Sequence, residues 1–415
     1  MKKEKTPNIR FKKFEHNWFK ECLNKVSNSI EYGLNASAKD FDGIHKYLRI
    51  TDIDESSRLF LTDKLSSPDV NFTIEDYENY KLQKNDLLFA RTGASVGKTY
   101  LYRESDGEVY YAGFLIRARL RNSYDGNFIF QQTLTEKYKQ FIEIISQRSG
   151  QPGVNGKEYG EWNVGMTTYH EQYAIGSLFR TLDDLLSSYK VNLDNYQSLK
   201  ATMLSKMFPK AGQTVPEIRL DGFEGEWELY ELKSRAETIT KGTTPKDKSW
   251  QGEVNYIKTE SINRDTGSLV RTASTSLEEH LGYLKRSILK EGDVLFSIVG
   301  TLGVVGIVDK KDLPANTNQQ IAIIRLKRDD AIFMLNFLKS PRIKSFIKSD
   351  STIGAQPSLS LWQIEKIKVS LPPSLEEQQA IGTYFSNLDN LIAAHQEKIS
   401  QLETLKKKLL QDMFI

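Results

Sequence analysis

One glycine-rich turn carries the residue types that could bind a nucleotide phosphate. It reads Gly93-Ala-Ser-Val-Gly-Lys-Thr99 and follows the apolar run Asp86-Leu-Leu-Phe89. A P-loop needs four residues between its glycines, whereas this turn has three. The matching turn later in the chain, Gly300-Thr-Leu-Gly303, has no lysine. NTP hydrolysis is therefore disfavoured, and we predict a hairpin whose polar side chains could approach a phosphate or a base edge.

Other catalytic patterns also fail. Pro68-Asp69 could begin a nuclease metal site, but the acidic-x-Lys that should follow comes only at Glu231-x-Lys233, in the next module. The sequence has no Asn/Asp-Pro-Pro-aromatic motif of a methyltransferase and no G-x-G-x-x-G nucleotide loop. One Cys and five scattered His make a metal site improbable. We therefore expect no catalytic residue, no metal and no cofactor in this chain.

The remaining polar residues cluster in turns. Such turns suit contacts with phosphates and base edges when they contain Thr, Ser, Asn, Gln, Lys or Arg. The same residue types also suit ordinary turn formation. We take them as candidate DNA-binding residues, and we expect Lys98 and Lys246 to act through their charge. The candidates are Arg91, Thr92, Ser95, Lys98, Thr99, Gln151, Asn155, Lys157, Lys241, Thr243, Thr244, Lys246, Gln356, Ser358 and Ser360.

These turns recur because the sequence contains an internal duplication. Phe14-Glu-x-x-Trp18 returns as Phe223-Glu-x-x-Trp227, and each copy ends on Met-Phe, at 207–208 and 413–414. A period of half the chain excludes a solenoid, whose units run to about 20–50 residues. It indicates a duplicated domain with two similar surfaces about a pseudo-two-fold axis. Duplex DNA is the commonest partner of such an arrangement.

A long helix is predicted to close each copy. Thr168-x-x-Glu171 and Ser374-x-x-Glu377 are capping boxes, and a sustained a/d heptad follows each of them. We predict that the two helices pair as an antiparallel coiled coil that also forms the subunit interface. The seam residues are Ile175, Phe179, Leu182, Leu186, Leu193, Lys200, Ile381, Phe385, Leu388, Ile392, Ile399, Leu402, Lys406 and Leu409.

Two seam positions are lysines, and their role is open at this point. Lys200 and Lys406 occupy the same heptad position. A polar seam residue can fix the register of a coiled coil, or the lysine stems can extend to solvent while Leu199 and Leu405 pack. From 175 to 207 the seam spans roughly 50 Å at about 1.5 Å per residue, or some 15 base pairs. The helix pair is therefore predicted to act as a ruler between two modules.

The expected fold class is α+β, with two tandem α/β modules that are each followed by a long helix. Strands are predicted at 87–90, 112–120, 294–299 and 321–326, and helical stretches at 128–147 and 331–348. The expected domains are a basic tail at 1–13, a first module at 14–165, a spacer helix at 166–208, a linker at 209–222, a second module at 223–371 and a second spacer helix at 372–415.

Composition bounds the location and the partners. The 415 residues allow two to four domains, and the net charge of +3 is a weak nucleic-acid signal that requires local clusters of Lys and Arg. The single Cys22 fits a reducing compartment. No apolar run reaches the roughly 18 residues of a membrane span, and the N-terminus lacks a signal-peptide pattern. We expect a cytoplasmic protein with no membrane partner.

Taken together, these residues resemble the specificity subunits of type I restriction–modification systems. The resemblance is carried by Leu88-Phe-Ala-Arg-Thr-Gly93, by Gly242-Thr-Thr-Pro245 with Trp250, and by Leu371-Pro-Pro-Ser-Leu-Glu-Glu-Gln-Gln-Ala-Ile-Gly382 with its heptad helix. The first copy departs from the pattern. It reads Gly33-Leu-Asn-Ala36 in place of Gly-Thr-Thr-Pro, and it has no Pro-Pro before its long helix.

The resemblance implies that 14–165 and 223–371 are target-recognition domains, each reading one half of a split double-stranded DNA sequence. It implies assembly with two modification subunits, which bind S-adenosylmethionine and methylate adenine. It further implies two restriction subunits that use ATP and Mg²⁺. The chain itself would bind no cofactor and would be the non-catalytic specificity subunit of the complex.

Two other function classes stay open from the sequence. The chain could be an assembly adaptor that recruits partners through its coiled coil and binds no DNA, or a DNA enzyme with unrecognised motifs. A salt titration of DNA binding separates the DNA-recognition class from the adaptor class. Each neutralised phosphate contributes roughly −0.9 to the slope of log affinity against log salt.

Overall fold

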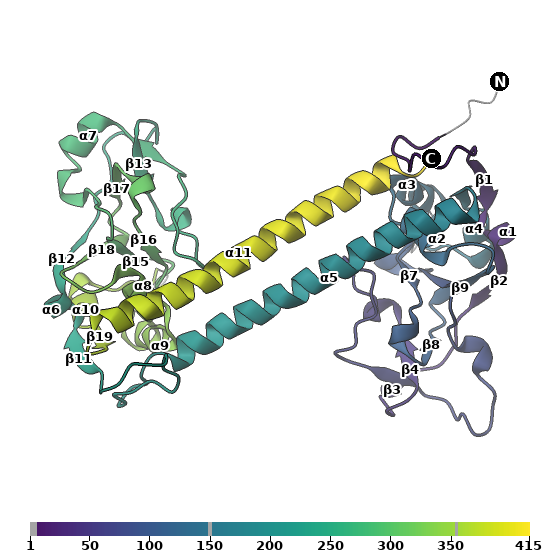
Figure 1. Ribbon diagram of the computed structural model, residues 1–415, viewed down its shortest axis with the longest axis horizontal. Helices are drawn as coiled ribbons and strands as arrows, with labels where there is room; N and C mark the ends of the chain where they lie inside the picture. The colour runs from purple at the N-terminus through teal and green to yellow at the C-terminus, as the bar shows by residue number, and fades with distance from the viewer. Residues whose placement is uncertain (1–5, 148–151, 353–355) are drawn as a thin grey trace. The chain divides into compact units, whose positions relative to one another are not determined.

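The computed structural model describes residues 6–147, 152–352 and 356–415 of the chain (Figure 1). The chain divides into two compact units: unit 1 comprises Met1–Lys190 and Glu397–Ile415, and unit 2 comprises Val191–Gln396. Each unit has its own buried apolar cores. Each also contains part of both long helices, α5 (Tyr169–Lys206) and α11 (Leu375–Asp412). The two units are therefore described separately.

Unit 1 is built on an antiparallel sheet of four strands in the order β2-β9-β6-β7. Beside it, β4 and β8 form a parallel pair and β1 and β10 an antiparallel pair. The elements before α5 are β1 (Phe19–Cys22), α1 (Leu23–Val26), β2 (Ser27–Tyr32), β3 (Ala38–Asp40), β4 (Lys46–Leu48), β5 (Ser66–Pro68), β6 (Asp86–Ala90), β7 (Thr99–Leu101), β8 (Val109–Tyr111), β9 (Leu115–Leu120), α2 (Gly126–Gln132), α3 (Glu136–Ile145), α4 (Gly156–Gly160) and β10 (Asn163–Met166).

Unit 2 repeats this topology. Its sheet has the order β12-β18-β15-β16, with β13 and β17 parallel and β11 and β19 antiparallel. The duplicated sequence is thus a duplicated fold. The elements are β11 (Glu228–Glu231), α6 (Leu232–Arg235), β12 (Ala236–Lys241), β13 (Val254–Ile257), β14 (Ser274–Thr275), α7 (Leu277–Leu281), β15 (Val294–Ser297), β16 (Val305–Ile307), β17 (Ala315–Thr317), β18 (Ile321–Leu326), α8 (Ala331–Lys339), α9 (Pro341–Asp350), α10 (Leu361–Glu365) and β19 (Lys368–Leu371).

The central strands are mainly apolar because both faces of the sheet are covered. In β6, Leu87 and Phe89 face one core, and Leu88 and Ala90 face another. The strand begins with Asp86, whose buried carboxylate binds Arg119 of β9 through two hydrogen bonds of 2.9 Å. The corresponding pair in unit 2 joins β15 to β18 in the same way, with distances of 2.8 and 2.6 Å. A buried charge requires such a partner, so the pair fixes the strand ends.

The helices predicted at 128–147 and 331–348 are each two helices, so these two predictions are wrong in extent. In unit 1, α2 ends at Gln132, and Thr135 caps α3 by accepting a hydrogen bond from the Tyr138 N–H. In unit 2, α8 ends at Lys339 and Pro341 begins α9. Proline lacks an N–H group and favours the first turn of a helix, so it begins a new helix here. The strand predicted at 112–120 begins only at Leu115.

The predicted capping box of α11 is made in part. The Ser374 hydroxyl accepts a hydrogen bond from the Glu377 N–H at 3.1 Å. The Glu377 carboxylate instead accepts two hydrogen bonds of 2.8 Å from Arg219. Glu171 in α5 is bound by Arg10 in the same manner. These glutamates therefore tie the start of each long helix to the segment that precedes the β-strands of the same unit.

The predicted antiparallel pairing of the two long helices is confirmed. In unit 1, Phe179 and Leu182 from the first part of α5 share a core with Leu402 and Phe414 from the end of the chain. In unit 2, residues 203–208 share a core with residues 381–388 from the first part of α11. The start of each helix thus packs with the end of the other.

The seam lysines pair across the helices. In unit 2, the Lys200 ammonium lies 2.5 Å from the Asp389 carboxylate, and in unit 1 Lys406 lies 2.5 Å from Asp183. All four side chains are nearly buried. Because each pair joins α5 to α11 at one heptad position, it fixes the register of the coiled coil. The sequence left open whether these lysines fix the register or extend to solvent, and the pairing across the helices agrees with the first role.

In the part of the chain that the structure describes, we find no helix that combines the length and the apolar character needed to cross a membrane.

We predict that Asp389→Ala will destabilise unit 2 by about 3 kcal/mol, because it leaves the Lys200 ammonium buried without a carboxylate. The matched control is Glu403→Ala, which breaks the exposed Lys190–Glu403 pair and should cost under about 1 kcal/mol. Denaturant-induced unfolding, followed for both variants, measures the difference. Equal shifts in the unfolding midpoint would contradict a register-fixing role for Lys200–Asp389.

Candidate nucleic-acid interface

A glycine opens the loop that follows the first strand of each central sheet. A Cβ atom on Gly33 would lie 2.2 Å from the backbone oxygen of Ala112, and one on Gly242 would lie 2.0 Å from that of Thr317. Only glycine permits so close an approach of two backbones. The loops 33–36 and 242–245, which the sequence aligns with each other, are therefore held against the ends of β8 and β17 in the same way.

A buried tyrosine supports each of these loops from beneath. The Tyr47 hydroxyl donates a hydrogen bond to the Leu34 carbonyl at 2.8 Å, and the Tyr256 hydroxyl donates one to the Thr243 carbonyl at 2.9 Å. Burial raises the pKa of both phenols, so they stay protonated donors. Backbone and support are thus shared by the two copies, while the side chains that the loops present are different.

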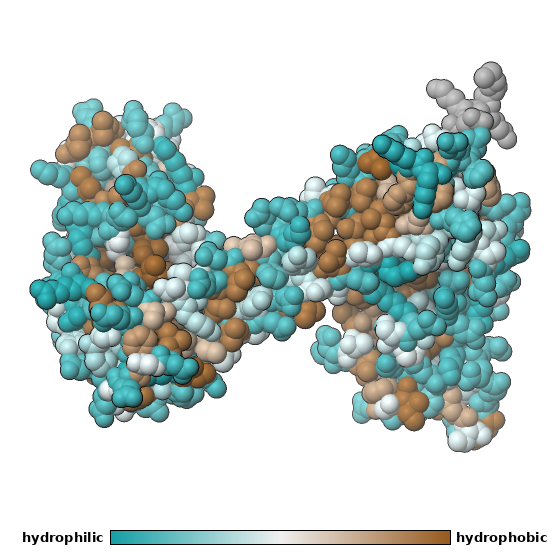
Figure 2. Space-filling view, in the orientation of Figure 1, coloured by the Kyte–Doolittle hydropathy of each residue, from teal (hydrophilic) through white to brown (hydrophobic). Residues whose placement is uncertain are grey.

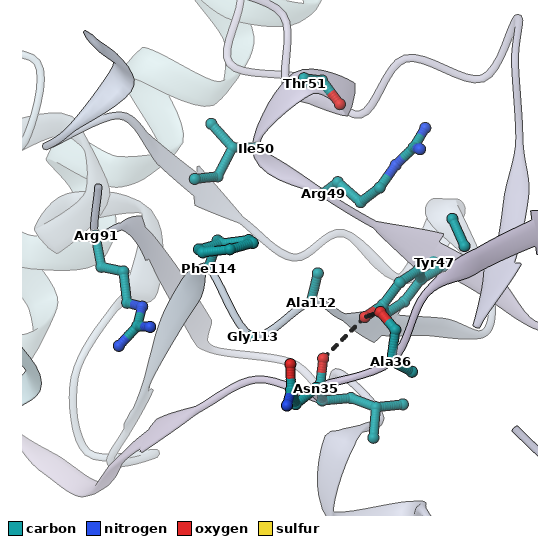
Figure 3. A pocket seen from close by; sticks show the side chains of 12 residues that line it. Asn35, Ala36, Tyr47, Arg49, Ile50, Thr51, Arg91, Ala112, Gly113 and Phe114 are labelled. Atoms are coloured by element: carbon teal, nitrogen blue, oxygen red, sulfur yellow. Dashed lines mark hydrogen bonds between the residues drawn. The ribbon is translucent and has the colours of Figure 1, made fainter. Parts of the chain in front are cut away.

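In unit 1 this loop borders a cavity of about 440 Å³ (Figure 3). The lining comes from three segments far apart in the sequence, at 34–38, 47–51 and 112–114, together with Arg91. The parallel pairing of β4 with β8 and the bridge between Leu34 and Ala112 bring these segments together. Of the lining residues, the sequence had predicted Arg91 alone. Arg91 could be predicted as a candidate because it directly follows β6, at the start of the glycine-rich turn.

Two arginines of the cavity differ in their partners. The Arg49 guanidinium makes two hydrogen bonds to Asp52, at 2.8 and 2.9 Å, and this contact raises the pKa of Arg49. The Arg91 guanidinium instead lies 5.2 Å from the ring centroid of Tyr32 and 5.8 Å from that of Phe114. Phe114 is 61% exposed at the edge of the cavity. An arginine beside an exposed aromatic ring suits a nucleic-acid ligand.

The glycine-rich turn after β6 is the predicted hairpin, but two of its candidate residues face inward. β6 and β7 pair as antiparallel strands around it. The Lys98 ammonium donates a hydrogen bond to the Ile53 carbonyl at 2.9 Å and pairs with Glu55 at 2.8 Å, and its side chain is 9% exposed. The buried Thr99 hydroxyl lies 2.7 Å from that of Thr133. The expectation that Lys98 and Thr99 contact DNA is therefore corrected: both residues hold the fold of unit 1.

The other candidates of the first copy lie in or near the same hairpin. Thr92 and Ser95 are half-buried, and Thr92 forms a β-bridge with Gly153. Asn155 caps α4 by accepting a hydrogen bond from the Glu158 N–H at 3.0 Å, while Lys157 is exposed on that helix. Gln151 lies outside the described residues.

In the second copy, two candidate lysines are exposed: Lys241 is the last residue of β12, and Lys246 lies in the loop that follows. The Lys246 ammonium lies 4.8 Å from the centroid of the Tyr283 ring, and its backbone N–H donates a hydrogen bond to Glu279. The Thr244 hydroxyl donates a hydrogen bond to Gln319, and Thr243 anchors the loop through its backbone. The charge of Lys246 thus stays at the surface.

The last candidates lie before α10. Ser360 caps that helix in a capping box with Gln363, and the Ser358 hydroxyl lies 3.0 Å from that of Thr352. Gln356 is exposed next to Gly300. The bridge between Val299 and Ser358 brings this segment to the turn after β15. In the second copy, Lys246 therefore lies beside α7, whereas the segment 356–360 lies at the turn after β15 and the start of α10. Several candidates act as caps and turn anchors.

The predicted seam residues form one face of each long helix. The Tyr196 ring of α5 also contacts the His395 ring of α11, with centroids 5.1 Å apart. Of the twelve apolar seam residues, nine are buried and three are half-buried. The buried ones are Ile175, Phe179, Leu182, Leu186, Ile381, Phe385, Leu388, Ile392 and Leu402, and the half-buried ones are Leu193, Ile399 and Leu409.

Comparison with known proteins agrees with this architecture. The family model described as "Type I restriction modification DNA specificity domain" matches residues 224–404. The chain is 22% identical over 383 residues to the type I restriction enzyme MjaVIII specificity subunit of Methanocaldococcus jannaschii, covering 90% of this chain and 85% of that protein. It is 28% identical over 167 residues to the EcoBI specificity subunit of Escherichia coli, covering 39% of this chain and 35% of that protein.

Solved structures share the fold. The crystal structure of a type I restriction-modification system S subunit from M. genitalium aligns with a TM-score of 0.64 and 16% identity, over 99% of each chain. Together with the sequence matches, this likeness places the chain in a defined class, proteins with two similar domains and two long paired helices. Residues 224–404 thus match the type I DNA specificity domain, and most of the chain is similar in sequence and fold to type I specificity subunits.

We predict that Gly33→Ala will destabilise unit 1 by about 1–3 kcal/mol, because the added methyl group meets backbone atoms that cannot move aside. Gly156→Ala is the control, since its Cβ would make ordinary contacts at 3.5 Å or more. Thermal unfolding of the two variants measures the effect. A Gly33→Ala protein as stable as the control would show that the loop is not held against Ala112.

Proposed function

We propose that this chain is the DNA-recognition subunit of a type I restriction–modification enzyme and that it reads a two-part target. The observation that supports this most strongly is the repeated scaffold with unlike loop side chains. Gly33 and Gly242 hold equivalent loops, yet the residues that follow are Leu-Asn-Ala in one copy and Thr-Thr-Pro in the other. Two copies of one fold with different polar surfaces suit two different half-sites.

In this proposal the segments 14–165 and 223–371 are the target-recognition domains. The helical segments 166–208 and 372–415 set the distance between the half-sites, with 209–222 as the linker and 1–13 as a basic tail. Because the net charge is only +3, affinity must come from local cations. Arg91, Lys157, Lys241 and Lys246 are the candidates that leave a positive charge at or near the surface.

The proposed partners are two modification subunits, which would supply S-adenosylmethionine and methylate adenine, and two restriction subunits, which would use ATP and Mg²⁺. Apolar residues at the surface of α5 and α11 support docking of two equivalent subunits (Figure 2). Leu185 and Leu391 stand at the same position of the two copies and are 42% and 41% exposed. The chain itself would be non-catalytic and would work in the cytoplasm, where restriction systems meet DNA.

A charge-removal pair tests the DNA contacts. Lys246→Ala should weaken binding of the assembled complex to specific and nonspecific duplexes alike, and should reduce the slope of log affinity against log salt by about one. Lys98→Ala is the matched control: its ammonium is held within unit 1, so the salt slope should stay unchanged and the unfolding midpoint should fall. Titrations at several salt concentrations measure both. A slope reduced equally by the two substitutions would contradict the assignment.

A domain exchange tests the division of labour between the copies. We replace residues 14–165 by the first module of another specificity subunit and express the chimera with the modification subunits. Because each unit has its own core, one half of the methylated sequence should change and the other half should stay. Sequencing of methylated genomic DNA gives the answer, and a change in both halves would refute independent reading.

A matched insertion tests the proposed spacing role. Seven residues added after Lys190 and seven after Gln396 leave the Lys200–Asp389 and Lys406–Asp183 pairs intact within their units. Each insertion adds about 10 Å of helix, equivalent to roughly three base pairs. The gap in methylated sites should lengthen accordingly, while an insertion in one helix alone should break the register and impair assembly. An unchanged gap in an assembled double-insertion variant would exclude the ruler.

A further inference from the structure

The cavity of unit 1 contains one guanidinium whose charge is not balanced among the described residues. The Arg49 guanidinium makes a bidentate pair with the Asp52 carboxylate. Arg91 has no carboxylate partner in the described part of the chain, and its Nε atom is buried without a hydrogen-bond acceptor. A ligand that brings two acceptors would therefore gain more from Arg91 than from Arg49.

Two rings restrict the direction of the Arg91 side chain. The guanidinium lies near the faces of Tyr32 and Phe114, at 5.2 and 5.8 Å from their centroids. In the close view, Phe114 lies beside Arg91, and Arg49 lies on the far side of the cavity (Figure 3). Because Nε is buried, the terminal nitrogens carry the donors that a ligand can reach. A guanidinium held in this way loses little entropy when it forms two parallel hydrogen bonds.

Such a pair of donors fits the O6 and N7 atoms of guanine, and it also fits a phosphate. The internal repeat decides between these ligands. The residue equivalent to Arg91 is Ile298: the Arg91 carbonyl accepts a hydrogen bond from Val154, and the Ile298 carbonyl accepts one from Leu359, both at 2.9 Å. Ile298 is 3% exposed and belongs to the core of unit 2.

The other arginine of the cavity, Arg49, keeps its charge in the second copy, because the equivalent residue in unit 2 is Lys258. Phosphate contacts carry no sequence information, so a domain that binds any duplex would keep them in both copies. A base contact is expected to differ between two domains that read different half-sites. The replacement of Arg91 by a buried isoleucine on the same scaffold therefore favours a base contact for Arg91.

We propose that Arg91 is a specificity-determining residue that donates two hydrogen bonds to O6 and N7 of one guanine, in the half-site read by unit 1. This inference rests on the proposed function and deepens it, since it names the base and the groove. The major groove is where these two acceptors of guanine are exposed.

The test uses the full chain assembled with its modification subunits. We compare the methylated sequences produced by the wild type, Arg91→Ala and Arg91→Lys, which keeps the charge but loses the two-donor geometry. Both substitutions should relax one guanine position in the half-site of unit 1, by about tenfold or more in relative affinity for the other bases. The half-site of unit 2 should be unchanged. Lys64→Ala, which removes an exposed charge from unit 1, is the control and should relax no position.

A second measurement needs no variant to assemble. Binding of the wild-type complex is compared on duplexes in which 7-deazaguanine, which lacks the N7 acceptor, replaces each guanine of that half-site in turn. One replacement should weaken binding about tenfold, and where Arg91→Ala assembles, the same replacement should have no further effect on it. No sensitive guanine, or a loss of affinity in Arg91→Ala that is equal on all sequences, would overturn the inference in favour of a phosphate contact. A wild-type complex without any two-part target would instead overturn the proposed function.

Discussion

Each unit depends on an aromatic residue from the end of a helix that begins in the other unit. Phe414, just after α11, lies 5.6 Å from Phe128 and 5.7 Å from Phe179, measured between ring centroids, in the core of unit 1. Phe208, just after α5, lies 5.5 Å from Phe333 in the core of unit 2. Burial of a phenylalanine stabilises a core by several kcal/mol. Neither core is therefore complete without the helix that starts in the other half of the sequence.

This exchange of helix ends explains why the seam is strict while the loops vary. If α5 slid along α11, the aromatic residues would leave their cores and the nearly buried Lys200 and Lys406 would lose their carboxylates. The side chains of the loops at 33–36 and 242–245 are not under this constraint, because Gly33, Gly242 and the supporting tyrosines hold the loop backbones. The side chains of these loops can differ between copies without cost to the fold. A fold whose backbone does not depend on its loop side chains can recognise new DNA sequences by changing those side chains alone.

The sequence predicted what depends on periodicity and local rules. The duplication, the two long helices, their antiparallel pairing and the hairpin after β6 all follow from spacing. The direction of a turn side chain does not, because it depends on residues distant in sequence: Lys98 turns inward to the Ile53 carbonyl, and Thr99 meets Thr133. The break at Ser340 was signalled by Pro341, yet the apolar pattern continued across it. The cavity beside Arg91 could not be predicted, since parallel pairing of β4 with β8 assembles it from separate segments.

The most direct measurement of two-part recognition is the map of methylated adenines in a cell that expresses this chain with its modification subunits and no other methyltransferase. Two recognition domains on one helical frame predict a single motif with two specified blocks and a gap of fixed length and free sequence between them. A continuous motif, a gap of variable length or the absence of any methylated motif in an assembled complex would contradict it.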